Sequence, residues 1–212
     1  MGACTLCGNH VIFRLRAEQD KRIYYSCDQC QLIFVDPGMY LSRDEEKERY
    51  LQHNNGIDQP GYVRFLNRII EPTLDFLKPG MTGLDYGCGP VPTLSRLLAR
   101  AGITCYDYDP LFQKEHPLEA YDFIFATECF EHFFKPALEI RKIVELLKPA
   151  GYLCIMTERY ENVERFRTWY YKRDPTHVSF YHWNTFLFIS RQFGFDIQYH
   201  DRNRVIILKN KL

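Results

Sequence analysis

The 212-residue chain has no excess of charge of either sign and no long hydrophobic run. Lys and Arg number 27 and Asp and Glu also number 27, so the formal net charge is zero. This balance disfavours nucleic acid as a partner, because binding mainly through phosphates requires a basic face, although it leaves room for a local basic patch. No stretch approaches the roughly 18 apolar residues of a membrane span.

The beginning of the chain, MGACTLCGNH, lacks the basic and apolar regions of a signal peptide. The sequence also contains no internal repeat and no low-complexity tract. We therefore expect a cytoplasmic protein with no membrane partner, in which the eight cysteines are thiols or metal ligands and not disulfides. The composition, 46% hydrophobic and 25% charged, is that of an ordinary globular protein.

Four of the cysteines have the spacing of a metal site. Two C-x2-C pairs are separated by 19 residues, which is typical of four-thiolate zinc sites. Between the pairs, residues 11–16 and 22–26 alternate as two short strands, with a hairpin turn at 17–21. The alternatives are a redox dithiol pair or four unrelated buried thiols. We predict a zinc ribbon over residues 1–40, with a closed, structural Zn2+ site at Cys4, Cys7, Cys27 and Cys30.

Residues 41–60 are predicted to be a linker helix and loop. Ser42 and Glu45 have the spacing of a capping box, which predicts a helix from residue 43 to about residue 53. Residues 62–77 then carry apolar side chains at helical spacing and end at a Lys-Pro-Gly sequence.

Strands and helices alternate from there to the end of the chain. We predict strands at 83–85, 103–108, 121–127 and 152–157, helices at 93–101, 136–147 and 186–193, and two final strands at 195–199 and 205–208. This order predicts an α/β fold over residues 61–212, with a mostly parallel sheet, helices on both faces and an antiparallel edge.

The sequence LDYGCGPVP, residues 84–92, predicts a ligand-binding loop between a strand and a helix. Gly87 and Gly89 allow close backbone approach to a ligand, and Asp107 or Asp109 ends the next strand where a ribose would bind. A dinucleotide loop has a third glycine, whereas this loop ends in a proline that removes a phosphate-binding N–H group. S-adenosylmethionine, which has no phosphate, is therefore favoured over an NAD-type cofactor.

Four motifs in order, LDYGCGP, YDYDP, YDFIFATECFEHFFKP and ELLKPAGYLCIMTE, resemble the class I S-adenosylmethionine-dependent methyltransferases. They are most similar to the bacterial small-molecule-type branch, which has an E-H pair after the fourth strand. The resemblance covers about residues 60–212, and the N-terminal cysteines resemble zinc modules found on some members. It implies a Rossmann-like fold and methyl transfer.

The resemblance also implies roles for individual residues. Asp85 matches the acidic residue that orients the glycine loop, Gly87 and Gly89 match glycines that back the cofactor, and Asp109 matches the ribose-binding carboxylate better than Asp107 does. The segment that faces the transferred methyl group contains Glu128, which we assign to cofactor binding, and the E-H pair Glu131 and His132, which we assign to catalysis. The alternative for this E-H pair is a helix-capping role without chemistry.

The sequence departs from the family pattern at three places. Val91 replaces the third glycine, so the loop is expected to follow another path, because Val is strained at positive φ. Ala150 replaces the first glycine of the family's L-K-P-G-G turn. Too few residues separate Pro110 from Tyr121 for the usual helix and third strand, which predicts a shortened sheet.

Two missing motifs narrow the range of possible methyl acceptors. The chain has neither the N/D-P-P-Y/F sequence of amino-group methylators nor the Pro-Cys of cytosine methylators after the fourth strand. Residues 158–183 form an insertion that we predict to be a substrate lid, in which Trp169, Tyr170 and Tyr181 hold the acceptor. His177 in this insertion is either a general base with a near-neutral pKa or a structural residue bonded to Asp174.

The sequence patterns leave two alternative functions. The first is methyl transfer to a small organic acceptor at oxygen, nitrogen or carbon. The second is a zinc-ribbon module that binds RNA or protein, with a methyltransferase domain that acts on or docks to a macromolecule. The neutral charge and the aromatic insertion favour the first.

Overall fold

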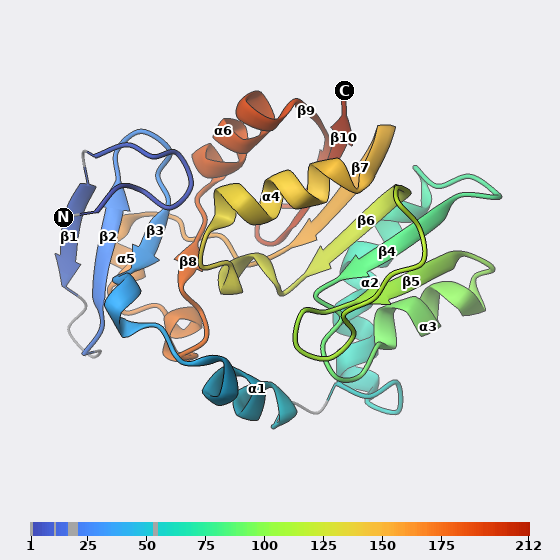
Figure 1. Ribbon diagram of the computed structural model, residues 1–212, viewed down its shortest axis with the longest axis horizontal. Helices are drawn as coiled ribbons and strands as arrows, with labels where there is room; N and C mark the ends of the chain where they lie inside the picture. Colours follow the sequence, from blue (N-terminus) through green and yellow to red (C-terminus); the bar gives the residue numbers. More distant parts are fainter. Residues whose placement is uncertain (1, 11, 17–20, 53–54) are drawn as a thin grey trace.

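The computed structural model describes residues 2–10, 12–16, 21–52 and 55–212, and its centre is a six-stranded sheet (Figure 1). The strand order is β5-β4-β6-β7-β10-β9. The bounds are β4 Thr82–Tyr86, β5 Thr104–Tyr108, β6 Tyr121–Thr127, β7 Leu147–Met156, β9 Phe195–His200 and β10 Val205–Asn210. Strands β5, β4, β6 and β7 are parallel, so their carboxyl ends meet at one edge of the sheet, where ligands bind in folds of this kind.

Helices cover both faces of this sheet, as the alternating pattern predicted. Helices α2 (Pro60–Leu74) and α3 (Thr93–Arg100) pack on one face, against side chains such as Phe123 and Phe125. Helices α4 (Pro136–Glu145) and α6 (Trp183–Phe193) pack on the other, against Ile124 and Ala126. Successive residues of a strand point to opposite faces, which is why β6 is apolar from Phe123 to Ala126. The predicted α/β class is confirmed.

The two ends of the sheet also agree with the sequence patterns. Between β5 and β6 the chain forms no strand, and an isolated bridge from Asp109 to Gln113 is the remnant of pairing there. At the other end, β9 is the edge strand and pairs antiparallel with β10. The strand that runs against the parallel set is β10, which lies between β7 and β9 and not at the edge itself.

A second sheet of four strands joins the N-terminal ribbon to the 158–183 insertion. Its order is β1-β2-β3-β8, with bounds β1 Ile12–Arg16, β2 Ile23–Cys27, β3 Ile33–Val35 and β8 Ser179–Phe180. The predicted β1–β2 pair is confirmed, while residues 11 and 17–20 of that prediction lie outside the described residues. The pairing of β3 with β8 was not predicted, since neither short strand has a pattern of its own.

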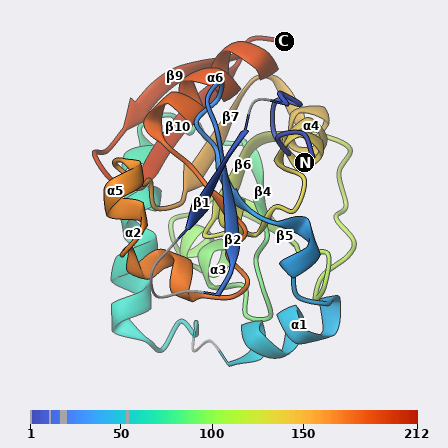
Figure 2. The ribbon, with the colours of Figure 1, turned by 90° about the vertical axis from the view of Figure 1, so that its left-hand side faces the viewer.

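The ribbon is not a separate body on a tether. Cys27, Cys30, Leu32 and Phe34 belong to the same buried hydrophobic cluster as Phe186 of α6. Figure 2 shows the ribbon strands in front of the larger sheet, with α6 beside them. The ribbon therefore derives stability from contacts with the larger sheet and its helices as well as from any metal ion.

Short helices complete the structure. Helix α1 (Arg43–Leu51) has the predicted capping box between Ser42 and Glu45, and position 53, the predicted end, lies outside the described residues. The others are η1 Pro37–Met39, η2 Phe130–His132, α5 Val163–Phe166 and η3 Tyr170–Arg173. Within the described ranges, no helix is both long and apolar enough to cross a bilayer.

Candidate functional site

The glycine loop after β4 is held against the end of β5. Gly87 and Gly89 have φ angles of 85° and 68°, in the region that favours glycine. The Tyr108 carbonyl accepts hydrogen bonds from the Gly87 and Cys88 amides at 2.8 and 3.1 Å. Val91 avoids positive φ, and Pro92 caps α3, so the loop takes the alternative path that the missing third glycine predicted.

The two glycines have different surroundings. A Cβ atom on Gly87 would lie 2.8 Å from the Cβ of Cys129, so this position has no room for a side chain. A Cβ atom on Gly89 would meet no atom within 4 Å, so its backbone borders open space. We call Gly87 and Gly89 the glycine cradle. Its open backbone at Gly89 suits a cofactor that approaches the loop closely.

Asp109 ties this loop to the segment that follows β5. Its Oδ2 accepts a hydrogen bond from the Gly89 amide at 3.1 Å, and its Oδ1 accepts from the Leu111 and Phe112 amides at 2.8 and 3.2 Å. Each carboxylate oxygen has two lone pairs, so Oδ2 keeps one for a ribose hydroxyl. Asp107 lies in β5 and pairs in register with Asp85 of β4.

Asp85 is buried at the end of β4. Burial, together with the nearby carboxylates of Asp107 and Asp109, raises its pKa well above the usual range. A cationic group bound against this cluster would stabilise the ionised form. S-adenosylmethionine carries an ammonium and a sulfonium, so its charges suit this cluster of carboxylates.

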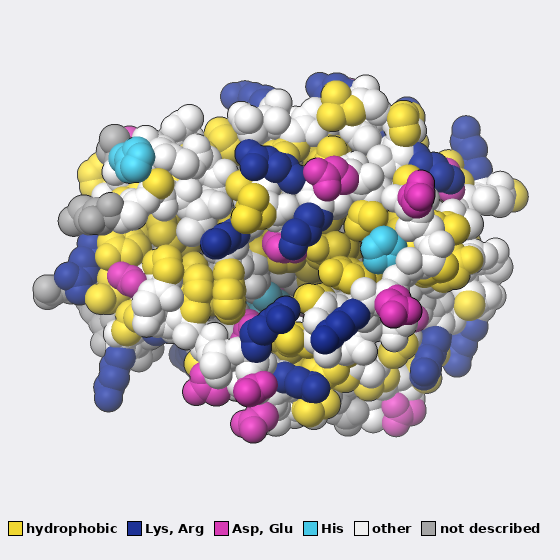
Figure 3. Space-filling view, viewed as in Figure 1, with side chains coloured by type: hydrophobic (Ala, Val, Ile, Leu, Met, Phe, Trp, Pro, Cys, Tyr) yellow, Lys and Arg dark blue, Asp and Glu magenta, His cyan; other side chains and the backbone are white. Residues whose placement is uncertain are grey.

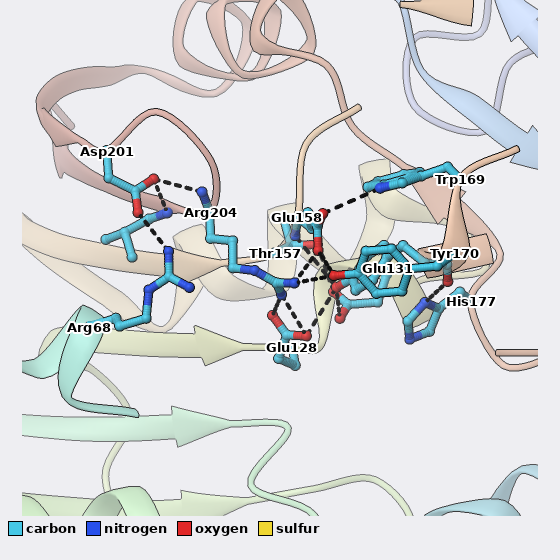
Figure 4. Close-up of polar contacts among 12 residues, drawn as sticks. Arg68, Glu128, Glu131, Thr157, Glu158, Trp169, Tyr170, His177, Asp201 and Arg204 are labelled. Carbon is cyan, nitrogen blue, oxygen red and sulfur yellow. Dashed lines mark hydrogen bonds and ion pairs between the residues drawn. The ribbon is translucent and has the colours of Figure 1, made fainter. Parts of the chain in front are cut away.

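Glu128 follows β6 in a strained backbone conformation, with φ of 49°. Its carboxylate contacts Arg204 at 3.0 Å, and Arg204 also contacts Glu158. Figure 4 shows these three side chains pointing toward one another. Burial and the charge of Glu131 raise the pKa of Glu128, against the effect of Arg204.

Glu131 lies in η2, completely buried. Its Oε2 accepts a hydrogen bond from the Thr157 hydroxyl at 2.8 Å, and its Oε1 accepts one from the Tyr171 hydroxyl. Burial raises its pKa to about 6, although both hydroxyls favour the ionised form. Its carboxylate thus bonds to the residue that follows β7 and to the 158–183 insertion, and is more than a helix cap.

His132 and His177 are brought together by the insertion. Their ring centroids lie 4.9 Å apart, and the Nδ1 atoms lie 3.1 Å from the Thr176 carbonyl and 2.7 Å from the Tyr171 carbonyl, respectively. The predicted near-neutral pKa of His177 is wrong, because burial and the adjacent His132 lower it to about 3. His177 is therefore neutral at physiological pH. The carboxylate of Asp174, its suggested partner, binds Thr176 and Arg49.

One of the three aromatic residues predicted to hold the acceptor lies in the core. Tyr181 is 0% exposed, lies among Phe130 and Phe186, and donates to the Phe130 carbonyl, so it belongs to the core. Tyr170 is 53% exposed and bonds to Glu158 and Arg204. Trp169 donates from Nε1 to Glu158 at 3.3 Å.

Several site residues were missed by the sequence patterns. Arg204 comes from the turn before β10, and Tyr171 from the insertion, and neither belongs to a motif. The segment predicted to be a linker also reaches the site, because Tyr50 of α1 packs edge-on against His132 at 5.2 Å. Glu46 of the same helix is buried, and burial raises its pKa to about 7. The one sequence feature that could have indicated this role of α1 is that the helix carries both apolar and acidic residues.

The four ribbon cysteines form a compact group. The Sγ atoms of Cys4 and Cys30 lie 3.6 Å apart, those of Cys7 and Cys27 lie 3.4 Å apart, and all four lie within 4.8 Å of one another. Zinc at about 2.3 Å from each of four thiolates requires sulfurs roughly 3.8 Å apart. Burial raises the pKa of Cys7 to about 12, so a cation is needed to hold all four as thiolates. The donor set fits zinc.

Comparisons with known proteins agree with this architecture. The model of a methyltransferase-domain family matches residues 55–200, which is more than half of the chain. A sequence comparison with curated proteins finds no match.

Among solved structures, a SAM-dependent methyltransferase from Methanosarcina mazei is similar with a TM-score of 0.50 and 17% identity, over 66% of this chain and 97% of that one. A SAM-dependent methyltransferase from Archaeoglobus fulgidus has a TM-score of 0.50 and 16% identity, over 70% and 99%. A Haloferax volcanii complex of the Trm112 methyltransferase activator with a protein assigned as a methyltransferase has a TM-score of 0.52 and 15% identity, over 77% and 81%. At these identities the likeness concerns the fold.

The glycine loop, the nearby carboxylates of Asp85 and Asp109 and the family match agree with one another. The chain belongs to the methyltransferase-domain family and is an S-adenosylmethionine-dependent methyltransferase.

Proposed function

We propose that the methyl acceptor is a small organic molecule. The observation that carries this proposal is a cavity of about 750 Å³ next to the polar network of Glu158, Tyr170 and Arg204. Tyr160, Phe166, Trp169 and Trp183 line it, together with Glu158. Charged and polar side chains also line it, among them Arg159, His182 and Asp201, so a cavity of this size with mixed aromatic and polar walls suits a small polar molecule.

In this function the chain holds the cofactor and deprotonates the acceptor. Asp109 accepts a hydrogen bond from the ribose, Asp85 lies against the cationic end, and Gly87 and Gly89 back the ligand. Bound S-adenosylmethionine supplies an electrophilic methyl group. A hydroxyl or carbon acceptor must lose a proton. The group formed by Glu131, His132 and His177 lowers the free-energy barrier of this proton removal.

We also propose one structural zinc ion per chain, at Cys4, Cys7, Cys27 and Cys30. All four positions of a tetrahedral ion are then filled by sulfur, so the ion has no open position for catalysis. Its role is to hold β1 and β2 and, through β3 and β8, the segment that carries His177. We expect the ribbon to be part of the support of the site.

The alternative, a macromolecular acceptor such as RNA, is less well supported. Figure 3 shows Lys and Arg side chains interspersed with Asp and Glu on the face it displays, without a continuous basic surface. The net charge of zero points the same way. A salt-dependent affinity for RNA in the nanomolar to micromolar range would favour this alternative over ours.

A turnover screen tests the proposal. The purified protein is incubated with S-adenosylmethionine and either pooled metabolites or RNA, and formation of S-adenosylhomocysteine is measured. We expect turnover with a metabolite pool and none with RNA. Turnover with RNA alone would contradict a small acceptor.

A Trp169→Ala variant sharpens the same screen. Because this side chain lines the cavity and not the glycine cradle, we expect a raised KM for the acceptor with unchanged affinity for the cofactor. An unchanged KM would show that the acceptor binds elsewhere.

A further inference from the structure

Glu131, His132 and His177 each offer one possible ligand atom, and these atoms form a compact group. These three atoms lie within 4.8 Å of one another. Two segments far apart in the sequence are fixed there by backbone pairing, since the Val178 amide donates to the Glu131 carbonyl at 2.8 Å. The Ser179 hydroxyl donates to the Phe133 carbonyl at 2.8 Å and adds a second bond between the same two segments. The cluster is therefore built into the fold.

The hydrogen bonds of the two histidines leave the same ring nitrogen free. Each Nδ1 lies within hydrogen-bond distance of a backbone carbonyl, at 3.1 Å for His132 and 2.7 Å for His177. A carbonyl oxygen only accepts, so each Nδ1 carries the proton and each Nε2 keeps its lone pair. A histidine that binds a metal ion through Nε2 has this partner on its other nitrogen.

The carboxylate of Glu131 also has room for an ion. Its oxygens accept one hydrogen bond each, from Thr157 and from Tyr171, out of about four lone-pair sites. Carboxylates that bind metal ions are usually oriented by such hydrogen bonds from neighbouring groups. Because both hydroxyls come from outside η2, they hold the carboxylate beside the imidazoles.

We propose that Glu131, His132 and His177 bind one divalent transition-metal ion, in addition to the zinc of the ribbon. Two imidazoles and one carboxylate suit Zn2+, Fe2+ or Co2+ and leave coordination positions open. This inference concerns the same site as the proposed function, and where that function holds it names the acceptor class as molecules with a metal-binding hydroxyl.

Binding to the ion would lower the pKa of such a hydroxyl. The proton leaves to solvent, and the acceptor oxygen bonds to the methyl carbon as the bond between that carbon and the cofactor sulfur breaks. S-adenosylhomocysteine and the methyl ether are the products. No oxidant or reductant is required.

Metal binding is tested without cofactor or acceptor. The full-length protein is first loaded with one equivalent of Zn2+ to fill the thiolate site, and is then titrated with Co2+ by calorimetry and visible absorption. We expect one further ion per chain, with the weak absorption of a nitrogen and oxygen site and without a sulfur-to-cobalt charge-transfer band. Failure of the wild-type protein to bind this second ion would overturn the proposal.

Variants locate the ion. His132→Ala, His177→Ala and Glu131→Gln should each weaken Co2+ binding by at least about tenfold, since loss of even an indirect partner costs roughly 10–100-fold. Glu131→Gln keeps a side-chain oxygen that can accept a hydrogen bond from Thr157 or Tyr171. It therefore separates the loss of a metal ligand from a loss of packing. His200→Ala, at the exposed edge strand β9, is the matched control and should bind as wild type does. Equal binding by all four variants would place the ion elsewhere and overturn the assignment.

A separate titration with S-adenosylmethionine distinguishes the two proposals. If the cofactor binds and Co2+ does not, the metal site is wrong and the proposed function stands. If Co2+ binds and the cofactor does not, the proposed function fails and the metal site stands.

Discussion

The proposed cofactor end of the site and the proposed acceptor end are built in different ways. The cofactor end comes from one short stretch, residues 85–109, because β4 and β5 are adjacent parallel strands whose carboxyl ends bring Gly89 and Asp109 within 3.1 Å. The acceptor end, by which we mean the proposed catalytic group and the polar network beside the cavity, draws Glu131, His177 and Arg204 from three distant segments. A motif can encode the first arrangement, while only the complete fold produces the second.

The ribbon shows how far this second arrangement extends. Arg22 of the ribbon donates from Nη1 to the His177 carbonyl at 3.0 Å, and Tyr24 packs edge-on against Phe166 of the insertion at 5.2 Å. The acceptor end thus depends on a region about 150 residues away in the sequence. The cofactor end has no such dependence on the ribbon among the described contacts, and this contrast can be tested.

The largest effect is expected from removing the zinc. Cys27→Ser should lose the ion and destabilise the ribbon by several kcal/mol, given that zinc contributes about 10–16 kcal/mol in zinc-finger peptides. Elemental analysis and thermal unfolding measure both effects. Because β3 pairs with β8, turnover should fall more than cofactor affinity does. A variant with full metal content and normal stability would remove the zinc site.

His177→Ala should lower turnover by roughly a hundredfold with nearly unchanged cofactor affinity, because it removes a proposed ligand of the ion that lowers the pKa of the acceptor hydroxyl. The measurement is kcat with an acceptor identified by the turnover screen. A lower melting temperature with unchanged specific activity would instead make His177 a structural residue.

A smaller effect is expected at the ribbon. Arg22→Ala removes the hydrogen bond to the His177 carbonyl, and we expect turnover to fall by about tenfold, since small misplacements near the chemistry are costly. Cofactor affinity measured by calorimetry should not change. Arg14→Ala, on the neighbouring ribbon strand β1, is the control and should leave both quantities unchanged. Equal loss in both variants would contradict a specific link.

The smallest effect concerns stability and pH. The pKa of Glu46 is about 7 in the folded chain because of burial, against 4.5 for a free side chain. The fold therefore favours the protonated form, and ionisation costs stability progressively as the pH rises from about 4.5 to 7. Glu46→Gln should raise the free energy of unfolding by about 1–2 kcal/mol at pH 8 and change it little at pH 4. Denaturant titrations at both values measure this, and an equal change at both would contradict it.

Much of the fold could be predicted from the sequence, since β6 and the helices on both sheet faces have strong periodicity. The glycine loop and Asp109 could be predicted because their neighbours in space are close in sequence. Tyr181 was misassigned because an aromatic run looks alike whether it lines a cavity or fills a core. The pKa of His177 could not be foreseen, since burial by Tyr171 and His132 depends on contacts across the fold.

Calorimetric titration with S-adenosylmethionine tests the central claim, that residues 85–109 form the cofactor site, most directly. The wild-type protein should bind one equivalent, and Asp109→Ala should weaken binding by about 1–3 kcal/mol through the lost ribose contact. Gly89→Val should also weaken it, since the added side chain would fill the open cradle. Absence of binding to the wild-type protein, or tight binding of NAD in its place, would contradict the account.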